Sequence, residues 1–463
     1  MKEPFIHPYI PNSDPEIQKE MLKDIGVTDI DDFFACIPDA QRYQGLLDLP
    51  KPYLSEVELK KHVYSIINKN TSAEELVSFL GGGCWQHHVP AICDEINSRS
   101  EFLTAYAGEP YEDHGRFQAL FEYTSMMAEL LDVDVVNVPT YDGSQAAATA
   151  LRMACRITNR SRVIVVNTTA PDRLSVIKGY LYPDFEVIEI GHDPIIGLLD
   201  LAELENIVDE NIGAVYFENP SYLGFIETQG QMISKAAHSC GALTVVYTDP
   251  SSLGILAPPS SYGADLTCGD IQPLGIHMFM GGGRGGFIGS PGDEKFIQEY
   301  PSRLFGIAPT THGEWGFGDV AWERTSFANR EDAKEFVGTA AALWGITAGV
   351  YLALMGPKGM RELGENCIKR ANYAIKKMAS IDNLKVPAIG KYFYKEFVVN
   401  FDETGKKVSD INDRLLERGI LGGHDLSSSY PQLGQSALYC FTEIHSLDTI
   451  DRFVAELVSI LKE

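Results

Sequence analysis

One acidic residue and the strand that precedes it give the first chemical signal in the chain. Short apolar runs at residues 214–217 and 243–247 flank a helical segment, a pattern that predicts two parallel strands joined by a crossover. The second run leads directly to Asp249. A carboxylate at the carboxyl end of a parallel strand can keep a pyridine nitrogen protonated, as chemistry on pyridoxal phosphate (PLP) requires. The pattern therefore predicts the frame of a PLP site.

A second segment suits the phosphate of such a cofactor. Gly143, Ser144 and Gln145 lead into a predicted helix at residues 147–158. Free backbone N–H groups and the positive end of the helix dipole favour an anion there. A capped helix without a ligand is the alternative, because small polar residues are common at helix starts in any case.

The residue that would bind the cofactor covalently is missing. PLP enzymes present a Schiff-base lysine some twenty residues after the acidic strand end, and this chain has Gln272 in that region, within the lysine-free residues 269–275. A self-sufficient PLP enzyme would need its lysine from elsewhere, and Lys295 and Lys334 are the candidates. The glycine-rich residues 281–286 could line the same site or form a tight connection between strands.

Composition narrows the class of protein. The chain has 463 residues and a formal net charge of −26, which disfavours nucleic acids and anionic membranes as partners. Its eight cysteines form no C-x-x-C pair, and the residues 81–88, which include two adjacent histidines, have no metal-ligand spacing. We therefore expect no metal site and a cytoplasmic protein with reduced thiols. Residues 336–357 carry no charge, and we expect them to form a helix buried between domains rather than a membrane span.

The order of the predicted elements indicates three regions. Residues 1–70 read as a helical arm that wraps a neighbour or the domain behind it, and residues 71–345 alternate strands with helices, as in a largely parallel sheet covered on both faces. Residues 346–463 contain strands and helices in an order that suggests a small α+β domain. The predicted fold class is therefore α/β, with a small C-terminal α+β domain.

These segments, taken in order, resemble the glycine cleavage system P-protein family, and in particular subunit 1 of its two-chain form. The resemblance covers essentially the whole chain, and the blocks that carry it lie at residues 9–38, 46–50, 78–106, 121–147, 262–289, 351–359 and 417–426. It implies the type I fold of PLP-dependent transferases. It also explains Gln272, because in the two-chain enzymes the Schiff-base lysine belongs to subunit 2.

The resemblance further implies an activity and two partners. The holoenzyme, a glycine dehydrogenase (decarboxylating), decarboxylates glycine on PLP that the partner subunit binds covalently, and passes the aminomethyl group to the lipoyl arm of the H-protein. This chain would pair with subunit 2 and complete the active site. Gly143, Ser144, Gln145, Asp249 and Gln272 would then be a vestigial cofactor site or part of an interface.

The chain also departs from the family pattern. Residues 107–115 replace the run that usually follows Tyr106 in the family. Tyr106, Glu109 and His114 are the candidate catalytic residues in the stretch from Tyr106 to Gly115. Residues 137–140 and 323–337 also differ. The alternatives are a diverged paralogous subunit that acts on another small amine or amino acid, and a non-catalytic structural or regulatory subunit.

Overall fold

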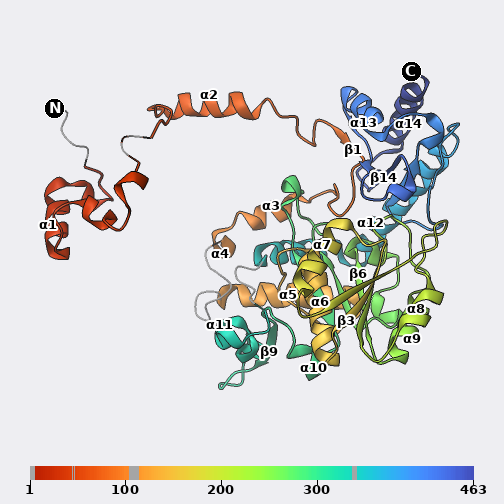
Figure 1. Cartoon of the computed structure of the whole chain (residues 1–463), viewed down its shortest axis with the longest axis horizontal. Helices are drawn as coiled ribbons and strands as arrows, with labels where there is room; N and C mark the ends of the chain where they lie inside the picture. The colour runs from red at the N-terminus through yellow and green to blue at the C-terminus, as the bar shows by residue number, and fades with distance from the viewer. Residues whose placement is uncertain (1–5, 44, 46, 104–113, 336–340) are drawn as a thin grey trace. The chain divides into compact units, whose positions relative to one another are not determined.

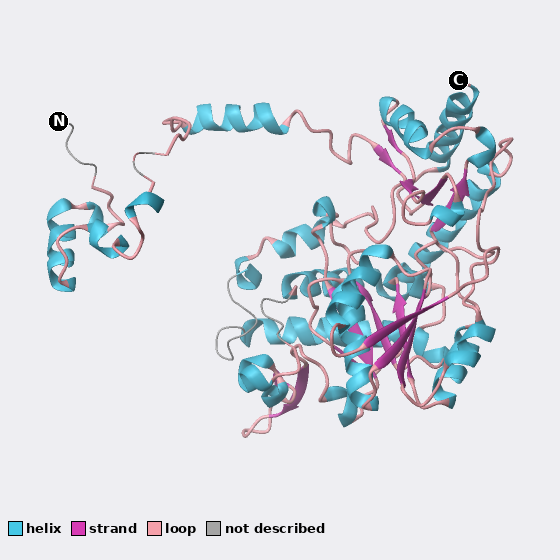
Figure 2. Ribbon diagram, in the orientation of Figure 1, coloured by secondary structure: helices cyan, strands magenta, loops and turns pink. Residues whose placement is uncertain are grey.

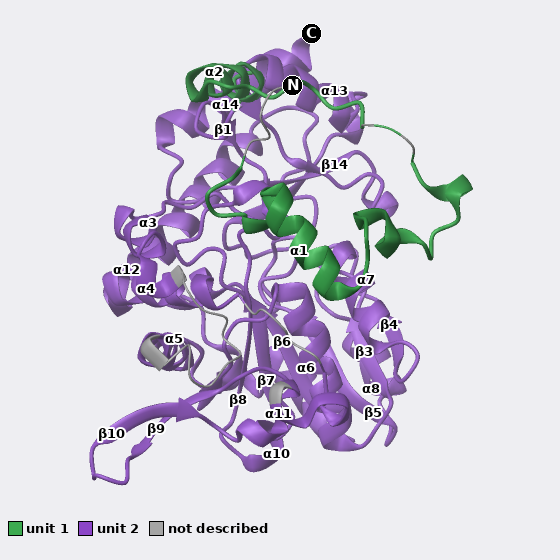
Figure 3. Cartoon of the chain, turned by 90° about the vertical axis from the view of Figure 1, so that its left-hand side faces the viewer, with its two compact units in different colours: residues 1–71 green, residues 72–463 purple. Residues whose placement is uncertain are grey.

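The computed structural model describes residues 6–43, 45, 47–103, 114–335 and 341–463. The chain divides into two compact units, Met1–Thr71 and Ser72–Glu463, which Figure 3 shows in green and purple.

The first unit is helical and has no core of its own. Its α-helices are α1 (Pro15–Ile25) and α2 (Glu56–Ile67), and the side chains of Asp14 and Ser55 cap their N-termini. None of the described residues in this unit is buried. Ile17, Met21 and Ile25 form an exposed apolar stripe at helical spacing along α1. A segment of this kind lacks the buried apolar area that a stable domain needs.

The second unit is built around a seven-stranded sheet, whose strands Figure 2 shows in magenta at the centre of the unit. The strand order is β2-β8-β7-β6-β5-β3-β4, and β7, β6, β5, β3 and β4 pair in parallel while β8 and β2 pair antiparallel at one side. The strands are β2 (Val135–Val136), β3 (Arg162–Val166), β4 (Glu186–Ile190), β5 (Ile212–Glu218), β6 (Leu243–Thr248), β7 (Leu266–Asp270) and β8 (Gly286–Ser290). The parallel strands predicted from the apolar runs are therefore present.

Both faces of the sheet are covered by helices (Figure 1). Along β5 the side chains alternate: Ala214 and Tyr216 pack in the cluster that includes α6 and α7, while Val215 and Phe217 pack in the cluster that includes α8 and α9. These helices are α6 (Gly143–Thr158), α7 (Pro171–Leu181), α8 (Leu201–Ile207) and α9 (Gly230–Ser239). A strand that is apolar on both faces is typical of a doubly covered parallel sheet, as the sequence predicts.

A third cluster of buried apolar residues connects the sheet to three further helices. It contains residues of α3 (Ala91–Asn97), α5 (His114–Leu131) and α12 (Ala342–Met378). Gly356, at φ 57° and immediately before Pro357, interrupts the helical geometry of α12, which separates the apolar half from the charged half. Within the described residues, no helix has the length and apolar content to cross a membrane.

The C-terminal residues form a smaller sheet with its own core. Strands β11 (Glu396–Asn400), β14 (Ser436–Cys440) and β13 (His424–Asp425) pair antiparallel in that order. They pack against the second half of α12, α13 (Val408–Glu417) and α14 (Leu447–Lys462). Strand β12 (Ile420–Leu421) pairs in parallel with β1 (Val77–Ser78), so the chain entering the second unit is fixed to its C-terminal part.

The remaining elements are short. They are α4 (Ser100–Leu103), α10 (Glu294–Ile297), α11 (Ser326–Asn329) and the antiparallel hairpin of β9 (Phe305–Pro309) and β10 (Trp315–Asp319). The glycine-rich residues 281–286 connect β7 to β8. The division of the second unit at residue 345 stays a prediction, and α12 runs through that position.

Candidate functional site: a cofactor site filled by the protein's own side chains

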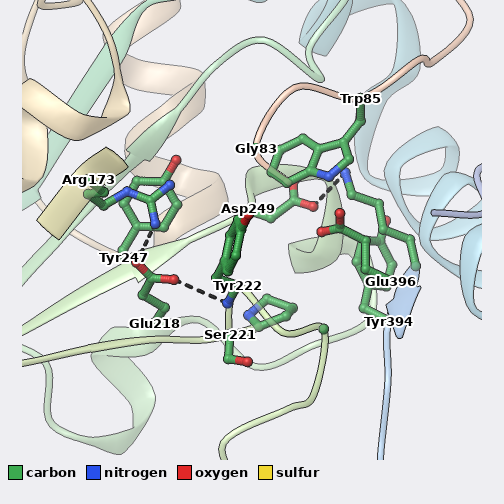
Figure 4. A pocket seen from close by; sticks show the side chains of 13 residues that line it. Gly83, Trp85, Arg173, Glu218, Ser221, Tyr222, Tyr247, Asp249, Tyr394 and Glu396 are labelled. Carbon is green, nitrogen blue, oxygen red and sulfur yellow. Dashed lines mark hydrogen bonds and ion pairs between the residues drawn. The ribbon is translucent and has the colours of Figure 1, made fainter. Parts of the chain in front are cut away.

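The predicted site residues lie at the carboxyl edge of the parallel sheet. Asp249 follows β6, and Gln272 follows β7. Gly143 is the first residue of α6, and its backbone N–H donates to the Asp270 carboxylate at the end of β7 (2.8 Å). Beside them is a pocket that Figure 4 shows from close by, with Arg173, Tyr247 and Glu218 on one side and Trp85, Tyr394 and Glu396 on the other.

The Asp249 carboxylate is buried and holds two different partners. Its Oδ1 accepts hydrogen bonds from the backbone N–H and the hydroxyl of Ser251 (2.9 and 2.7 Å). Asp249 thereby caps the short 3-10 turn Pro250–Gly254. Its Oδ2 lies 2.7 Å from the Nζ of Lys395. The strand end thus presents a carboxylate, as predicted, but that carboxylate is already paired with a cation.

Lys395 is the residue that sequence reasoning missed. It directly precedes β11 in the C-terminal part of the chain and is 1% exposed. Its ammonium also lies 3.0 Å from His87 Nε2 and 3.3 Å from Ser251 Oγ, and 3.6 Å from the centre of the Trp85 ring. Burial alone would lower the pKa of Lys395, but the Asp249 carboxylate outweighs burial and the pKa is raised. The lysine is therefore a charged ammonium and not a free amine.

His87 extends this pairing to a second carboxylate. An ammonium can only donate, so His87 Nε2 accepts from Lys395 and the ring proton must be on Nδ1. That Nδ1 donates to Glu443 Oε2 (2.8 Å), and the backbone N–H of His88 donates to Glu443 Oε1 (2.7 Å). Burial would raise the pKa of Glu443, but the His87 ring and these hydrogen bonds lower it to about 2.

The proton on His87 Nδ1 also disfavours a metal ion at the one group of side chains that could hold one among the described residues. His87, Cys367 and Glu443 are the only group among the described residues that brings three metal-ligand atoms together, within 4.8 Å of one another. A metal ligand must offer a lone pair, and the Nδ1 that faces this group carries a proton. The absence of a metal site remains a prediction, and the position of the Lys395 ammonium supports it.

Gln272, in the place predicted for a Schiff-base lysine, binds the backbone of Trp85. Its Oε1 accepts from the Trp85 N–H (3.0 Å) and its Nε2 donates to the Trp85 carbonyl (2.9 Å) and to the Ile276 carbonyl (3.1 Å). The side chain is 1% exposed. Gln272 therefore fixes the glycine-rich segment at residues 81–88 through the backbone of Trp85.

The N-terminus of α6, predicted to suit a phosphate, is filled by a carboxylate. The Asp270 side chain accepts from the Gly143 N–H and, at 2.6 Å, from Arg284 Nε. Asp142 caps the Gln145 N–H (2.8 Å), and Gln145 Oε1 accepts from the Tyr141 N–H (2.9 Å). A Cβ added at Gly143 would lie 2.7 Å from the Tyr247 hydroxyl, so the space above the helix start is occupied.

Ser144 completes the predicted helix start. It is buried, with an exposed fraction of 6%. The alternative reading of this segment, a capped helix without a ligand, matches the contacts of Gly143 and Gln145.

A second buried ion pair lines the other side of the pocket. Arg173, on α7, pairs with Glu218 at the end of β5, and its guanidinium lies 3.5 Å from the centre of the Tyr247 ring. Glu218 also accepts from the Tyr216 hydroxyl (3.2 Å) and the Tyr222 N–H (3.1 Å). Because a planar guanidinium covers the aromatic face, no cofactor ring can stack on that side of Tyr247.

Among the carboxyl groups described in this region, Glu396 is the one whose pKa is raised toward neutral pH. Its Oε1 accepts from the Gly82 N–H (2.7 Å), and burial raises the pKa of Glu396 to about 7. A Cβ at Gly81 would lie 2.0 Å from the same oxygen, so only glycine fits there. The carboxyl thus holds the glycine-rich segment against β11.

These residues do not fit PLP. The cavity that they leave has a volume of about 30 Å³, room for about two water molecules, whereas pockets for small organic ligands are typically about 300–1,000 Å³. Asp249 is paired with Lys395, Gln272 is bound to Trp85, and the α6 N-terminus is bound to Asp270. No reaction step on PLP can therefore be assigned to this chain.

The structure does not test the remaining catalytic candidates, and the two candidate lysines lie elsewhere. Tyr106 and Glu109 lie outside the described residues, and His114 is the first residue of α5, with a side chain that is not described. Lys334 binds Glu299 (2.8 Å), and Lys295 lies against the ring of Phe296. Neither lysine contacts Asp249.

Comparisons with known proteins agree with one another. The sequence profile of the glycine cleavage system P-protein family matches residues 7–436. A probable glycine dehydrogenase (decarboxylating) subunit 1 from Staphylothermus marinus is 37% identical and covers 99% of this chain and 99% of that protein. A relative of the same name from Geobacillus kaustophilus is also 37% identical, over 98% of this chain and 99% of its own length.

Solved structures are similar as well. The crystal structure of the glycine decarboxylase (P-protein) of the glycine cleavage system, in an inhibitor-bound form, has a TM-score of 0.86 and 31% identity, and the match covers 98% of this chain and 100% of that one. A sphingosine-1-phosphate lyase from Burkholderia pseudomallei, with a TM-score of 0.67 and 15% identity over 92% of this chain and 94% of its own, shares the fold alone. The predicted type I fold of PLP-dependent transferases is confirmed.

Proposed function

We propose, from the membership of this chain in the glycine cleavage system P-protein family, that it is the lysine-lacking subunit of a two-chain glycine dehydrogenase (decarboxylating). With a homologous, lysine-bearing second subunit it would decarboxylate glycine and transfer the aminomethyl group to the lipoyl arm of the H-protein. The near full-length similarity to relatives named subunit 1 supports this assignment.

The observation that carries the proposal is Gln272. At the place of the Schiff-base lysine, this side chain is buried and makes three hydrogen bonds to the backbone, so it is a structural replacement and not a vacant position. We infer that PLP is bound covalently by the partner subunit. This chain then contributes surface and side chains to the complex without a cofactor of its own.

The first unit supplies a surface for the partner. Large apolar residues such as Ile17, Met21, Val63 and Ile67 are exposed along α1 and α2. Aliphatic surface of this extent is stabilised when it is buried against another protein, and obligate interfaces typically bury more than about 2,000 Å². We propose that this arm packs on the second subunit.

The net charge and the free thiols support two further proposals, which concern the kinds of partner and the cellular compartment. A net charge of −26 disfavours nucleic acid and anionic membrane surfaces. All eight cysteines are free, which suits the reducing cytoplasm. We place the complex there.

Reconstitution tests the proposal. The chain and the lysine-bearing subunit, expressed together, should co-elute on size exclusion, and the complex with lipoylated H-protein should exchange labelled bicarbonate into the carboxyl group of glycine. Each chain alone should show no exchange. A stable complex without exchange would point to a paralogue for another small amino acid, and an active homodimer of this chain would refute the two-chain function.

A further inference from the structure

We propose that Lys395 is the resident cation of the former cofactor site, and that its ammonium occupies the place opposite Asp249 that a protonated pyridine nitrogen has in a PLP enzyme. The site is thus closed by the chain's own charges and not only by the loss of a lysine at position 272. This inference concerns the chain alone, so a failed reconstitution with a partner would not bear on it.

The contacts of Lys395 are those of a built cation site. The Lys395 ammonium forms an ion pair with Asp249 Oδ2 at 2.7 Å, and its N–H donors lie within hydrogen-bond distance of His87 Nε2 at 3.0 Å and Ser251 Oγ at 3.3 Å. A buried charge is tolerated only when it is paired and hydrogen-bonded, and here both conditions hold. These groups come from two separate parts of the chain, the turn at residues 249–251 after β6 and the segment at residues 81–88.

An aromatic ring covers the fourth side. The Trp85 ring centre lies 3.6 Å from Nζ, within the range of a cation–π contact. Gln272 holds the backbone of Trp85 from both its N–H and its carbonyl. The residue at the former lysine position therefore positions the ring that covers the new cation.

The anionic end of the site is filled in the same way. At the N-terminus of α6, where a cofactor phosphate would lie, the Asp270 carboxylate accepts from the Gly143 N–H and from Arg284. The chain thus supplies a cation for the carboxylate of β6 and an anion for the helix dipole. Both charges of the absent cofactor have an internal substitute.

Truncation of the lysine gives a direct test. Lys395→Ala removes a propylammonium group and leaves Asp249 buried without its cation. From the cost of breaking a buried pair and the unfolding entropy of a unit of this size, we expect the Tm of the full chain to fall by roughly 4–6 °C. Adding n-propylammonium should raise the Tm of this variant by several degrees, because this cation has the size and the positive charge of the group that was removed.

Two controls separate a specific site from a general salt effect. Lys377→Ala removes a half-exposed lysine that pairs with Asp451 (2.9 Å), and neither this variant nor the unchanged chain should respond to the amine. Sodium chloride at equal ionic strength should not replace n-propylammonium in Lys395→Ala. A Lys395→Ala chain that melts at the original temperature, or that gains nothing from the amine, would overturn the proposal.

A second variant covers the case in which Lys395→Ala does not fold. Lys395→Met leaves Asp249 unpaired, whereas the double variant Lys395→Met/Asp249→Asn removes both charges at nearly constant volume. We expect the double variant to recover most of the Tm that the single variant loses. A double variant no more stable than Lys395→Met would contradict the pairing of the two residues.

Discussion

Replacing Glu396 by glutamine should stabilise the protein, and it should do so more strongly at pH 8 than at pH 5. Burial raises the pKa of this carboxyl from 4.5 to about 7, against the opposing effects of Lys395 and of the hydrogen bond from Gly82. A carboxyl whose pKa is raised by folding binds protons more tightly in the folded state. Folding stability therefore falls as the pH rises from the unfolded pKa through the folded one.

The size of the effect follows from the two pKa values. At about 1.36 kcal/mol for each unit of pKa, the step from 4.5 to about 7 costs the folded state about 3 kcal/mol at pH 8 and about 1 kcal/mol at pH 5. Glutamine is neutral at both values and keeps the acceptor for the Gly82 N–H. Glu396→Gln should therefore gain about 3 kcal/mol at pH 8.

Urea unfolding of both proteins at pH 5 and pH 8 measures this gain. Glu443 does not interfere, because its lowered pKa of about 2 gives a stabilisation that is lost only below its ordinary value of about 4.5. Glu403→Gln, at an exposed position, controls for the change in net charge. Equal stability changes at the two pH values in Glu396→Gln would show that folding does not raise the pKa of this carboxyl.

Three further predictions concern the vestigial site, the sequence candidates and the arm. Gln272→Lys should remain folded by its melting curve yet give no borohydride-reducible adduct with PLP, because Trp85 and its neighbours still fill the site; an adduct would show that the lysine alone was missing. Glu109→Ala or His114→Ala should slow glycine–bicarbonate exchange by about 10²–10⁴-fold if that residue moves a proton, with assembly on size exclusion intact; unchanged rates in both variants would remove the segment from the mechanism. Deleting residues 1–71 should prevent co-elution with the second subunit while the rest of the chain still melts cooperatively, and a truncated chain that still assembles would assign the interface to other surfaces.

The sequence was sufficient where a local pattern determines the structure. Asp249 was placed correctly because a buried apolar run must be a strand and an acidic residue after it must lie at the sheet edge. The helix predicted at residues 147–158 is present as α6, but it begins four residues earlier, at Gly143, where Asp142 caps it. These predictions depend on neighbours within a few residues, which a single sequence contains.

The filling of the site could not be predicted from such patterns. Lys395 directly precedes β11 and lies 146 positions after Asp249 in the sequence, and no local signal links the two positions. A weak signal existed, because Lys395 and Glu396 interrupt an apolar run from Phe393 to Val399, and charges inside a strand-like run are buried only when paired. The partner of such a charge is decided by tertiary packing, which one sequence does not contain.

The most direct measurement is borohydride reduction of the assembled two-chain complex with PLP, followed by mapping of the reduced lysine. We expect one labelled lysine for each pair of chains, located in the second subunit, with no label anywhere in this chain. Label on Lys295, Lys334, Lys395 or any other lysine of this chain would contradict it.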